Sequence, residues 1–166
     1  MAAEQEAGVK AVKVFEIYIR ATPEQIWEAF TSPEWSRKYG YQVIYDYDLR
    51  PGGRFQARPN DVMRQMGLPD PIIDGEVVEA QKPNRLVQTY RFLFSKEDEA
   101  EGFTRITYDI QPTESGFCRV TITHDVTNAP RMARAISSQY NRQGAGGWGW
   151  ILSDLKSLLE TGKPMA

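Results

Sequence analysis

The sequence has few of the residues on which most protein chemistry depends. Its 166 residues include one histidine, His124, and one cysteine, Cys118. A single cysteine excludes an internal disulfide, and one histidine without ligand spacing around it does not make a metal site. The sequence contains no Gly-x-Ser-x-Gly elbow, P-loop or dinucleotide-binding fingerprint. It therefore shows no recognisable catalytic constellation, and we predict neither a metal nor a cofactor.

An excess of one charge and a long apolar run are also missing. The formal net charge is -2, with 41% hydrophobic and 25% charged residues. The sequence has no basic excess that would suggest nucleic-acid binding, and no apolar run approaches the roughly 20 residues that span a bilayer. Residues 1–8 are small and acidic and lack the apolar stretch of a secretory signal. We expect a cytoplasmic protein with one domain over residues 11–162, a flexible terminus over 1–10 and a short tail over 163–166.

The strongest pattern in the sequence is an amphipathic stretch near the C-terminus. Gly162 and Pro164 follow it, and both are typical of the end of a helix. A single helix with one apolar face needs a sheet to pack on. Its apolar residues recur at helical spacing at Trp148, Ile151, Leu152, Leu155, Leu158 and Leu159.

Alternating patterns predict that sheet. Thr22-Pro23-Glu24-Gln25 has the form of a capping box, and Ser32-Pro33-Glu34 begins a second short helix. We interpret Arg58 to Pro71 as a long loop, Ser95 to Gly102 as an exposed connection, and Pro130 to Gln143 as partly helical. The predicted fold is α+β, with about seven antiparallel strands curved around the last helix. The expected strands are residues 13–20, 41–48, 54–57, 72–80, 86–94, 104–111 and 119–126.

Several phrases, in their order, resemble one protein family. They are Ala21 to Phe30, Leu49 to Phe55, Asp74 to Glu79, Pro83 to Val87, Val120 to His124, and Gly147-Trp148. They are similar to the homologues of the activator of the ninety-kilodalton heat-shock chaperone's ATPase, within the START-like and birch-pollen-allergen (SRPBCC) superfamily. The resemblance implies a helix-grip fold. It implies ligand carriage, polyketide cyclisation or dehydration, or chaperone association as the function, and fold alone does not choose among them.

Inward-facing aromatic residues predict a pocket between the sheet and the last helix. Such a lining suits a small hydrophobic or aromatic ligand, while the alternative is that these side chains only fill the core. His124, Gln88 and the tyrosine hydroxyls would orient the ligand. His124 could also act as an acid or base, or it is a core histidine. The candidate pocket residues are Trp35, Tyr39, Phe55, Met63, Met66, Gln88, Tyr90, Phe92, Tyr108, His124, Trp148 and Leu152.

Three further interpretations of the sequence concern catalysis, the packing of Trp150 and a partner protein. Cys118 and His124 lie roughly 20 Å apart along one predicted strand, which excludes a nucleophilic dyad within one chain. Trp150 lies about 200° around the helix from Trp148. It therefore packs either on the Pro130 to Gln143 segment or on a second protomer, so a homodimer through the C-terminal region is possible. A chaperone partner is the third interpretation.

Overall fold

The computed structural model describes residues 10–137, 139–140, 142–144 and 146–165. Its strands form one antiparallel sheet in the order β1-β7-β6-β5-β4-β3-β2, so that β1 and β2 are the edges. This confirms the predicted α+β fold and its seven strands. The strands are β1 (Val12–Ile19), β2 (Ile44–Tyr47), β3 (Arg54–Arg58), β4 (Ile73–Gln81), β5 (Arg85–Phe92), β6 (Thr104–Pro112) and β7 (Cys118–Asp125).

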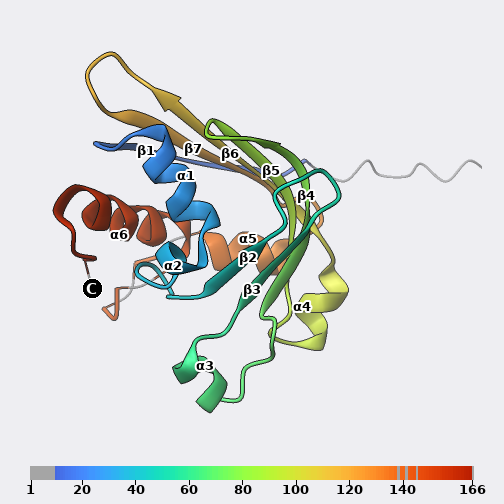
Figure 1. Cartoon of the computed structure of the whole chain (residues 1–166). Coiled ribbons are helices and arrows are strands. Elements are labelled where there is room, and N and C mark those ends of the chain that lie inside the picture. Colours follow the sequence, from blue (N-terminus) through green and yellow to red (C-terminus); the bar gives the residue numbers. More distant parts are fainter. Residues whose placement is uncertain (1–9, 138, 141, 145, 166) are drawn as a thin grey trace, which may run out of the picture.

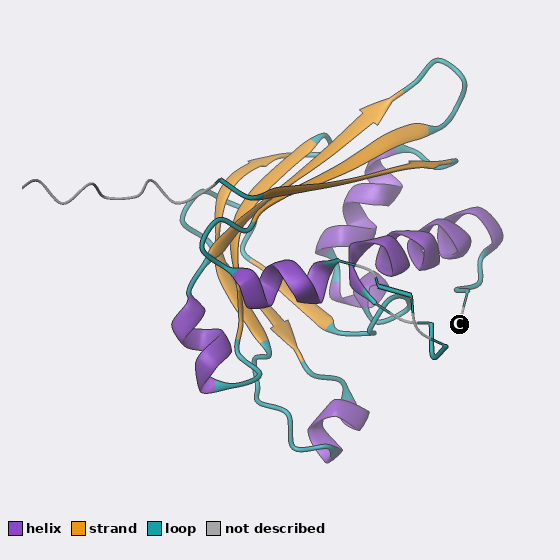
Figure 2. Ribbon diagram, turned by 180° about the vertical axis from the view of Figure 1, so that it is seen from behind, coloured by secondary structure: helices purple, strands orange, loops and turns teal. Residues whose placement is uncertain are grey.

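Six helices accompany the sheet in the described part of the chain. They are α1 (Pro23–Thr31), α2 (Pro33–Ser36), α3 (Asp61–Gln65), α4 (Lys96–Glu101), α5 (Pro130–Ile136) and α6 (Gly147–Thr161). The sheet is strongly curved, and α1, α2 and α6 lie on its concave side (Figures 1 and 2). α5 lies between α4 and α6 and contacts both of them (Figure 2). The helix-grip arrangement is therefore present.

The first helix begins with the capping box that the sequence predicts. The Thr22 side chain accepts a hydrogen bond from the Gln25 backbone N–H, and the Gln25 side chain accepts one from the Thr22 N–H. Two backbone donors at the start of α1 are thereby satisfied. The apolar side of this helix, with Ile26, Trp27 and Phe30, is buried against the sheet.

Removal of this cap should weaken the fold measurably. Thr22→Ala is expected to lower the free energy of unfolding by about 1 kcal/mol, because the N–H of Gln25 loses its acceptor. Urea titration followed by circular dichroism measures the change. Thr22→Ser keeps the hydroxyl and should stay near the wild-type value. Equal stability of the alanine variant and the wild type would contradict the capping role.

The bend of the sheet has a local cause in β4. A Cβ atom on Gly75 would lie 2.0 Å from the Thr89 carbonyl oxygen of β5, so only glycine fits this close approach. The pairing of β4 with β5 then shifts register between Val77 and Glu79. Such irregularities increase the local twist of a strand pair.

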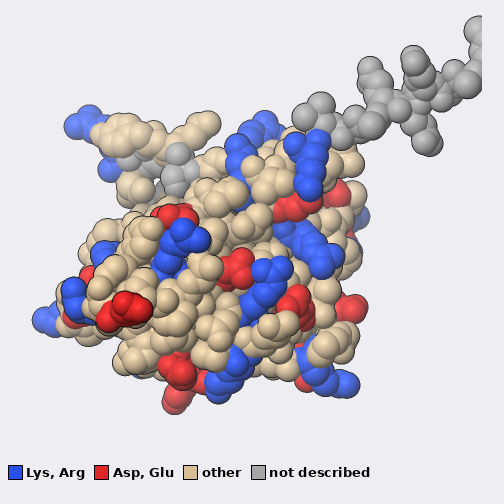
Figure 3. All heavy atoms as spheres, turned by 90° about the horizontal axis from the view of Figure 1, so that it is seen from above, with Lys and Arg blue, Asp and Glu red and all other residues tan. Residues whose placement is uncertain are grey.

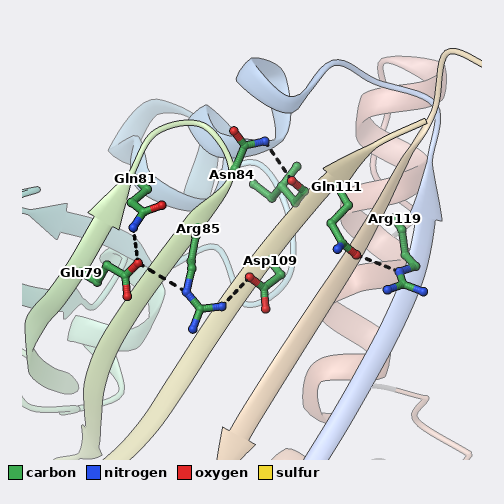
Figure 4. A network of polar contacts seen from close by, with 8 residues as sticks. Glu79, Gln81, Asn84, Arg85, Asp109, Gln111 and Arg119 are labelled. Atoms are coloured by element: carbon green, nitrogen blue, oxygen red, sulfur yellow. Dashed lines mark hydrogen bonds and ion pairs between the residues drawn. The ribbon is translucent and has the colours of Figure 1, made fainter. Parts of the chain in front are cut away.

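The outer surface is polar and of mixed charge. Figure 3 shows lysine and arginine side chains interspersed with acidic ones over the face that it presents. On the sheet face turned away from α6, Arg85 lies between Asp109 and Glu79, with nitrogen–oxygen distances of 2.8 and 3.5 Å (Figure 4). Exposed ion pairs of this kind contribute little to stability. They mark this face as solvated, and the core lies on the concave side.

Two segments that we predicted to be irregular contain helices. α3 lies inside the predicted loop Arg58 to Pro71, where the Asn60 side chain accepts from the Met63 N–H at 2.9 Å. α4 lies inside the predicted connection Ser95 to Gly102. Both predictions were wrong because one or two turns of helix give no apolar period, so that the capping residue is the main signal.

Two other boundaries differ from the prediction. β2 begins only at Ile44, because Gln42 has a φ of 57°, a left-handed conformation that no strand continues through. α5 ends at Ile136, and Tyr140, which we expected at helical spacing, is 94% exposed. The predicted flexible terminus falls almost wholly on residues 1–9, which lie outside the described residues.

The last helix has the predicted stripe and the predicted end. Leu152, Leu155 and Leu158 are buried, and Gly162 closes α6 in the left-handed conformation with its N–H on the Leu158 carbonyl. Asp154 on the same helix is also buried. Its carboxylate accepts from the Gly40 N–H at 2.7 Å and from the Met165 N–H at 2.5 Å. This carboxylate therefore ties α6 to the segment before β2, which fixes one side of the site.

Candidate functional site

A cavity of about 680 Å³ lies between the sheet, α5 and the first turn of α6. Its volume falls within the range of small-molecule sites, and most of its lining is apolar. β2 with the segment before it, the start of β4, the end of β5 and the four helices α3, α4, α5 and α6 contribute to the wall. The lining residues are Tyr41, Val43, Tyr45, Met63, Ile72, Ile73, Tyr90, Phe92, Phe94, Asp98, Arg131, Arg134, Ala135, Ile136, Gly147, Trp148 and Ile151.

Tyr90 of β5 lines the cavity and is the centre of an aromatic cluster. Its ring stacks on Phe55 with centroids 6.0 Å apart and meets His124 edge-on at 5.6 Å. Trp148 lies 6.3 Å away at the start of α6. Aromatic pairs in such orientations stabilise beyond the area that they bury. The cluster holds the sheet side and the helix side of the wall in fixed positions.

A chain of hydrogen bonds fixes the orientation of Trp148. The indole Nε1–H donates to His124 Nδ1 at 3.2 Å, and His124 Nε2 lies 2.7 Å from Thr104 Oγ1. The Thr104 hydroxyl donates to the Tyr90 carbonyl at 2.8 Å. Because an indole only donates and the Thr104 proton is already used, His124 is neutral with its proton on Nε2. Burial lowers the pKa of His124 to about 4, which agrees with this assignment.

Two tyrosine hydroxyls of the wall have no partner among the described residues. The hydroxyls of Tyr45 and Tyr90 form no hydrogen bond with any described residue. Thr121 Oγ1 is the only polar side-chain atom of the described residues that is fully enclosed without a partner, so both hydroxyls keep access to the cavity. Burial raises the pKa of Tyr45 to about 12 and also raises that of Tyr90. Both hydroxyls therefore keep their protons and can donate to a ligand.

The charged part of the lining comes from α4 and α5. Arg131 Nε lies 2.8 Å from Asp98 Oδ1, so the opposite charges of these two side chains neutralise each other. The Glu101 carboxylate accepts from the backbone N–H groups of Arg131 and Met132, which anchors the start of α5 on α4. Within the described part of the chain, the Arg134 side chain forms no ion pair or hydrogen bond. Arg134 is thus the one uncompensated charge among the lining residues.

Four of the twelve predicted pocket residues line the cavity, namely Met63, Tyr90, Phe92 and Trp148. Seven others do not reach it. Phe55, Tyr108 and Leu152 are buried in the core behind the wall, Tyr39 donates to the Ala29 carbonyl, and Trp35 has Lys38 over its ring. Gln88 accepts from the Tyr47 hydroxyl, and His124 uses both ring nitrogens inside the protein.

The twelfth predicted residue, Met66, is turned away from the site. It caps the end of α3 with 73% of its surface exposed, whereas Met63 on the same short helix faces the cavity. The placement of Met66 in the pocket is therefore corrected. Residues three apart on a helix share a face only when the helix continues, and α3 ends at Gln65.

Much of the wall consists of residues that sequence patterns did not predict. Tyr41, Val43 and Tyr45 share one side of their segment, and that parity was a usable signal. The same signal places Thr104 beside Ile106 on the inner face of β6. Asp98, Arg131 and Arg134 had no signal, because the position of α5 depends on its contact with α4.

Trp150 contacts a residue that we did not expect, and its packing on a second protomer stays a prediction. Its ring packs on Tyr41, with centroids 5.4 Å apart, at the outer edge of the cavity. The Tyr41 hydroxyl also accepts from the Gly147 N–H at 3.2 Å. Tyr41 therefore joins the segment before β2 to the first turn of α6.

Comparison with known proteins identifies the family. A family model described as "Activator of Hsp90 ATPase homolog 1-like protein" matches residues 20–160. The chain belongs to this family. The resemblance noted in the sequence phrases is thereby confirmed. A search of curated protein sequences found no match.

Solved structures share the fold of the family at low sequence identity. A protein of Nitrosomonas europaea is 23% identical, with a TM-score of 0.64 over 91% of this chain and 95% of that one. The Aha1 dimer of Colwellia psychrerythraea is 20% identical, with a TM-score of 0.62 over 92% and 98%. An HSP90 activator of Plasmodium falciparum is 21% identical, with a TM-score of 0.54 over 90% and 87%. These likenesses concern the fold.

The described residues contain neither a candidate membrane-spanning helix nor a candidate metal cluster. No helix among them has the length and apolar character needed to cross a membrane. They contain no group of three or more histidine, cysteine, aspartate or glutamate side chains that could hold a metal ion. Cys118 is a free, buried thiol that donates to the Ala21 carbonyl, and burial raises its pKa.

Proposed function

We propose that the protein binds a small, largely apolar molecule in the cavity between the sheet, α5 and α6. One observation carries the proposal: an aromatic and aliphatic cavity of about 680 Å³ that presents the unpartnered hydroxyls of Tyr45 and Tyr90. Buried polar groups in proteins almost always have partners. A ligand with a hydrogen-bond acceptor would supply one, while burial of its apolar part contributes about 25 cal/mol per Å² before association costs.

The other two functions implied by the family have less support. A polyketide cyclase or dehydratase needs an acid or base at the ligand. His124 lies behind the wall with both ring nitrogens engaged, and the raised pKa of the two wall tyrosines keeps them protonated, so neither supplies a base at the ligand. A chaperone-docking module predicts a closed interior, which does not agree with the cavity. Chaperone association would be tested by capture of purified heat-shock chaperone.

Binding can be tested with a neutral fluorescent probe. N-phenyl-1-naphthylamine should bind the wild type saturably at one site, with an increase in its fluorescence. Ala135→Trp, which places an indole on the α5 side of the cavity, should weaken this binding at least tenfold because the ligand volume is filled. Ala135 is exposed, so the substitution should leave the fold intact.

Ala100→Trp is the matched control, because Ala100 is an exposed alanine of the neighbouring helix α4 outside the lining. It should bind the probe as the wild type does. An absence of saturable binding to the wild type, or equal affinity of both tryptophan variants, would argue against the cavity as the binding site.

We also infer a cytoplasmic location, because the single cysteine is a free thiol. Assembly into a homodimer through the C-terminal region stays a prediction. The Colwellia psychrerythraea relative is a dimer, and light scattering would give the state of this chain.

A further inference from the structure

We propose that the bound molecule ends in a carboxylate, which Arg134 holds at the mouth of the cavity. This inference rests on the proposed ligand-binding function and names the class of ligand. It begins from the charges of the wall. Asp98 and Arg131 neutralise each other at 2.8 Å, and Arg134 has no partner among the described residues. The other lining residues are uncharged.

The structure keeps Arg134 available and directed to the cavity. Arg131 and Arg134 lie three residues apart on α5, so they share a helix face, and both line the cavity. Asp98, the one acidic lining residue, binds the Arg131 side chain, and Glu101 of the same helix binds the N–H groups of Arg131 and Met132. No acidic side chain of the wall therefore competes with a ligand for Arg134.

The polarity of the cavity fits an amphipathic molecule in one orientation. Arg134 is exposed on α5, whereas Val43, Ile72 and Tyr90 are buried deeper in the wall. An apolar tail would lie along the buried part while the head group stays partly hydrated beside the guanidinium. Guanidinium and carboxylate match in geometry and form charge-assisted hydrogen bonds. A single uncompensated cation suits a monoanion better than a phosphate dianion.

The test compares two ligands of the same chain length, decanoate and decan-1-ol, by displacement of N-phenyl-1-naphthylamine at pH 7.5. Wild type should bind decanoate about two- to fivefold more tightly than the alcohol, as expected for one partly exposed ion pair. Higher salt should reduce this preference. Arg134→Gln should abolish it while leaving the affinity for decan-1-ol unchanged, and Arg134→Lys should keep part of it.

The control is Arg105→Gln, which removes the same charge from an exposed position on β6 outside the cavity. It should retain the wild-type preference for the acid. Equal binding of acid and alcohol by the wild type, or an equal loss of preference in both glutamine variants, would overturn the role of Arg134 while leaving ligand binding intact. Failure of both ligands to displace the probe would overturn this inference together with the proposed function.

Discussion

Trp148→Ala is expected to lower the free energy of unfolding by about 3–5 kcal/mol, the range for removal of a large buried aromatic. Trp148 is only 3% exposed and meets Tyr108 edge-on with centroids 6.0 Å apart. Its loss would enlarge a cavity that already exists and would leave His124 Nδ1 without its donor. Urea unfolding followed by circular dichroism gives the change from the midpoint and slope.

Two variants separate the contributions of the ring and of its N–H group. Trp148→Phe keeps an aromatic ring but removes the donor to His124, and it should cost about 1–3 kcal/mol. Trp150→Phe changes a half-buried ring on the same helix, which packs on Tyr41, and should cost clearly less. If the free energy of unfolding of Trp148→Ala stayed within about 1 kcal/mol of the wild-type value, the contacts of Trp148 would not be a main link between α6 and the sheet.

Strand parity identified the inward faces from the sequence but not the limits of the cavity. Gln88, Tyr90 and Phe92 lie on one face of β5, and parity assigned all three to a pocket. Only the last two line it, since Gln88 is enclosed where it binds Tyr47. Position along the strand decides the outcome, because only the end of β5 and the first turn of α6 border the cavity. That depends on contacts between distant segments.

The polar end of the site was out of reach of sequence patterns for a related reason. The orientation of α5, and with it the position of Arg131 and Arg134, depends on hydrogen bonds from the start of α5 to the Glu101 carboxylate. Glu101 lies some thirty positions earlier in the chain. α4, which carries Glu101, has no apolar stripe and reads as an exposed connection. Helices as short as α4 and α5 give no clear periodic signal. The family phrases also do not include these positions, because they lie on the sheet, α1 and α6.

A loss of stability on acidification, with a midpoint well above the pKa of ordinary carboxylates, is the second large effect that we expect. Burial lowers the pKa of His124 to about 4, against 6.5 for an ordinary histidine, and Asp125 opposes this shift only in part. Above pH 6.5 the histidine is neutral in the folded and unfolded chain, and stability is at its full value. As the pH falls from 6.5 to 4, only the unfolded chain takes up the proton, so the free energy of unfolding decreases.

The expected loss across this window is about 3 kcal/mol, as an upper estimate from the pKa difference. The structural reason is that a proton on Nδ1 would face the indole N–H of Trp148, which has no way to accept it. Asp70, Asp125 and Glu160 also have a lowered pKa. Their contribution is lost mainly below about pH 4.5, where unfolded carboxyl groups titrate, so it does not account for a decrease at pH 5–6.

His124→Gln provides the decisive comparison, because His124 is the only histidine. A glutamine amide can accept from Trp148 and donate to Thr104 without titrating. Urea unfolding at intervals between pH 4.5 and 8 should show a decrease for the wild type below pH 6.5 and a nearly flat profile for the variant. A flat wild-type profile, or the same decrease in both proteins, would mean that His124 protonates as readily in the folded chain as in the unfolded one. The hydrogen-bond chain from Trp148 through His124 to Thr104 would then not be what holds the wall of the cavity.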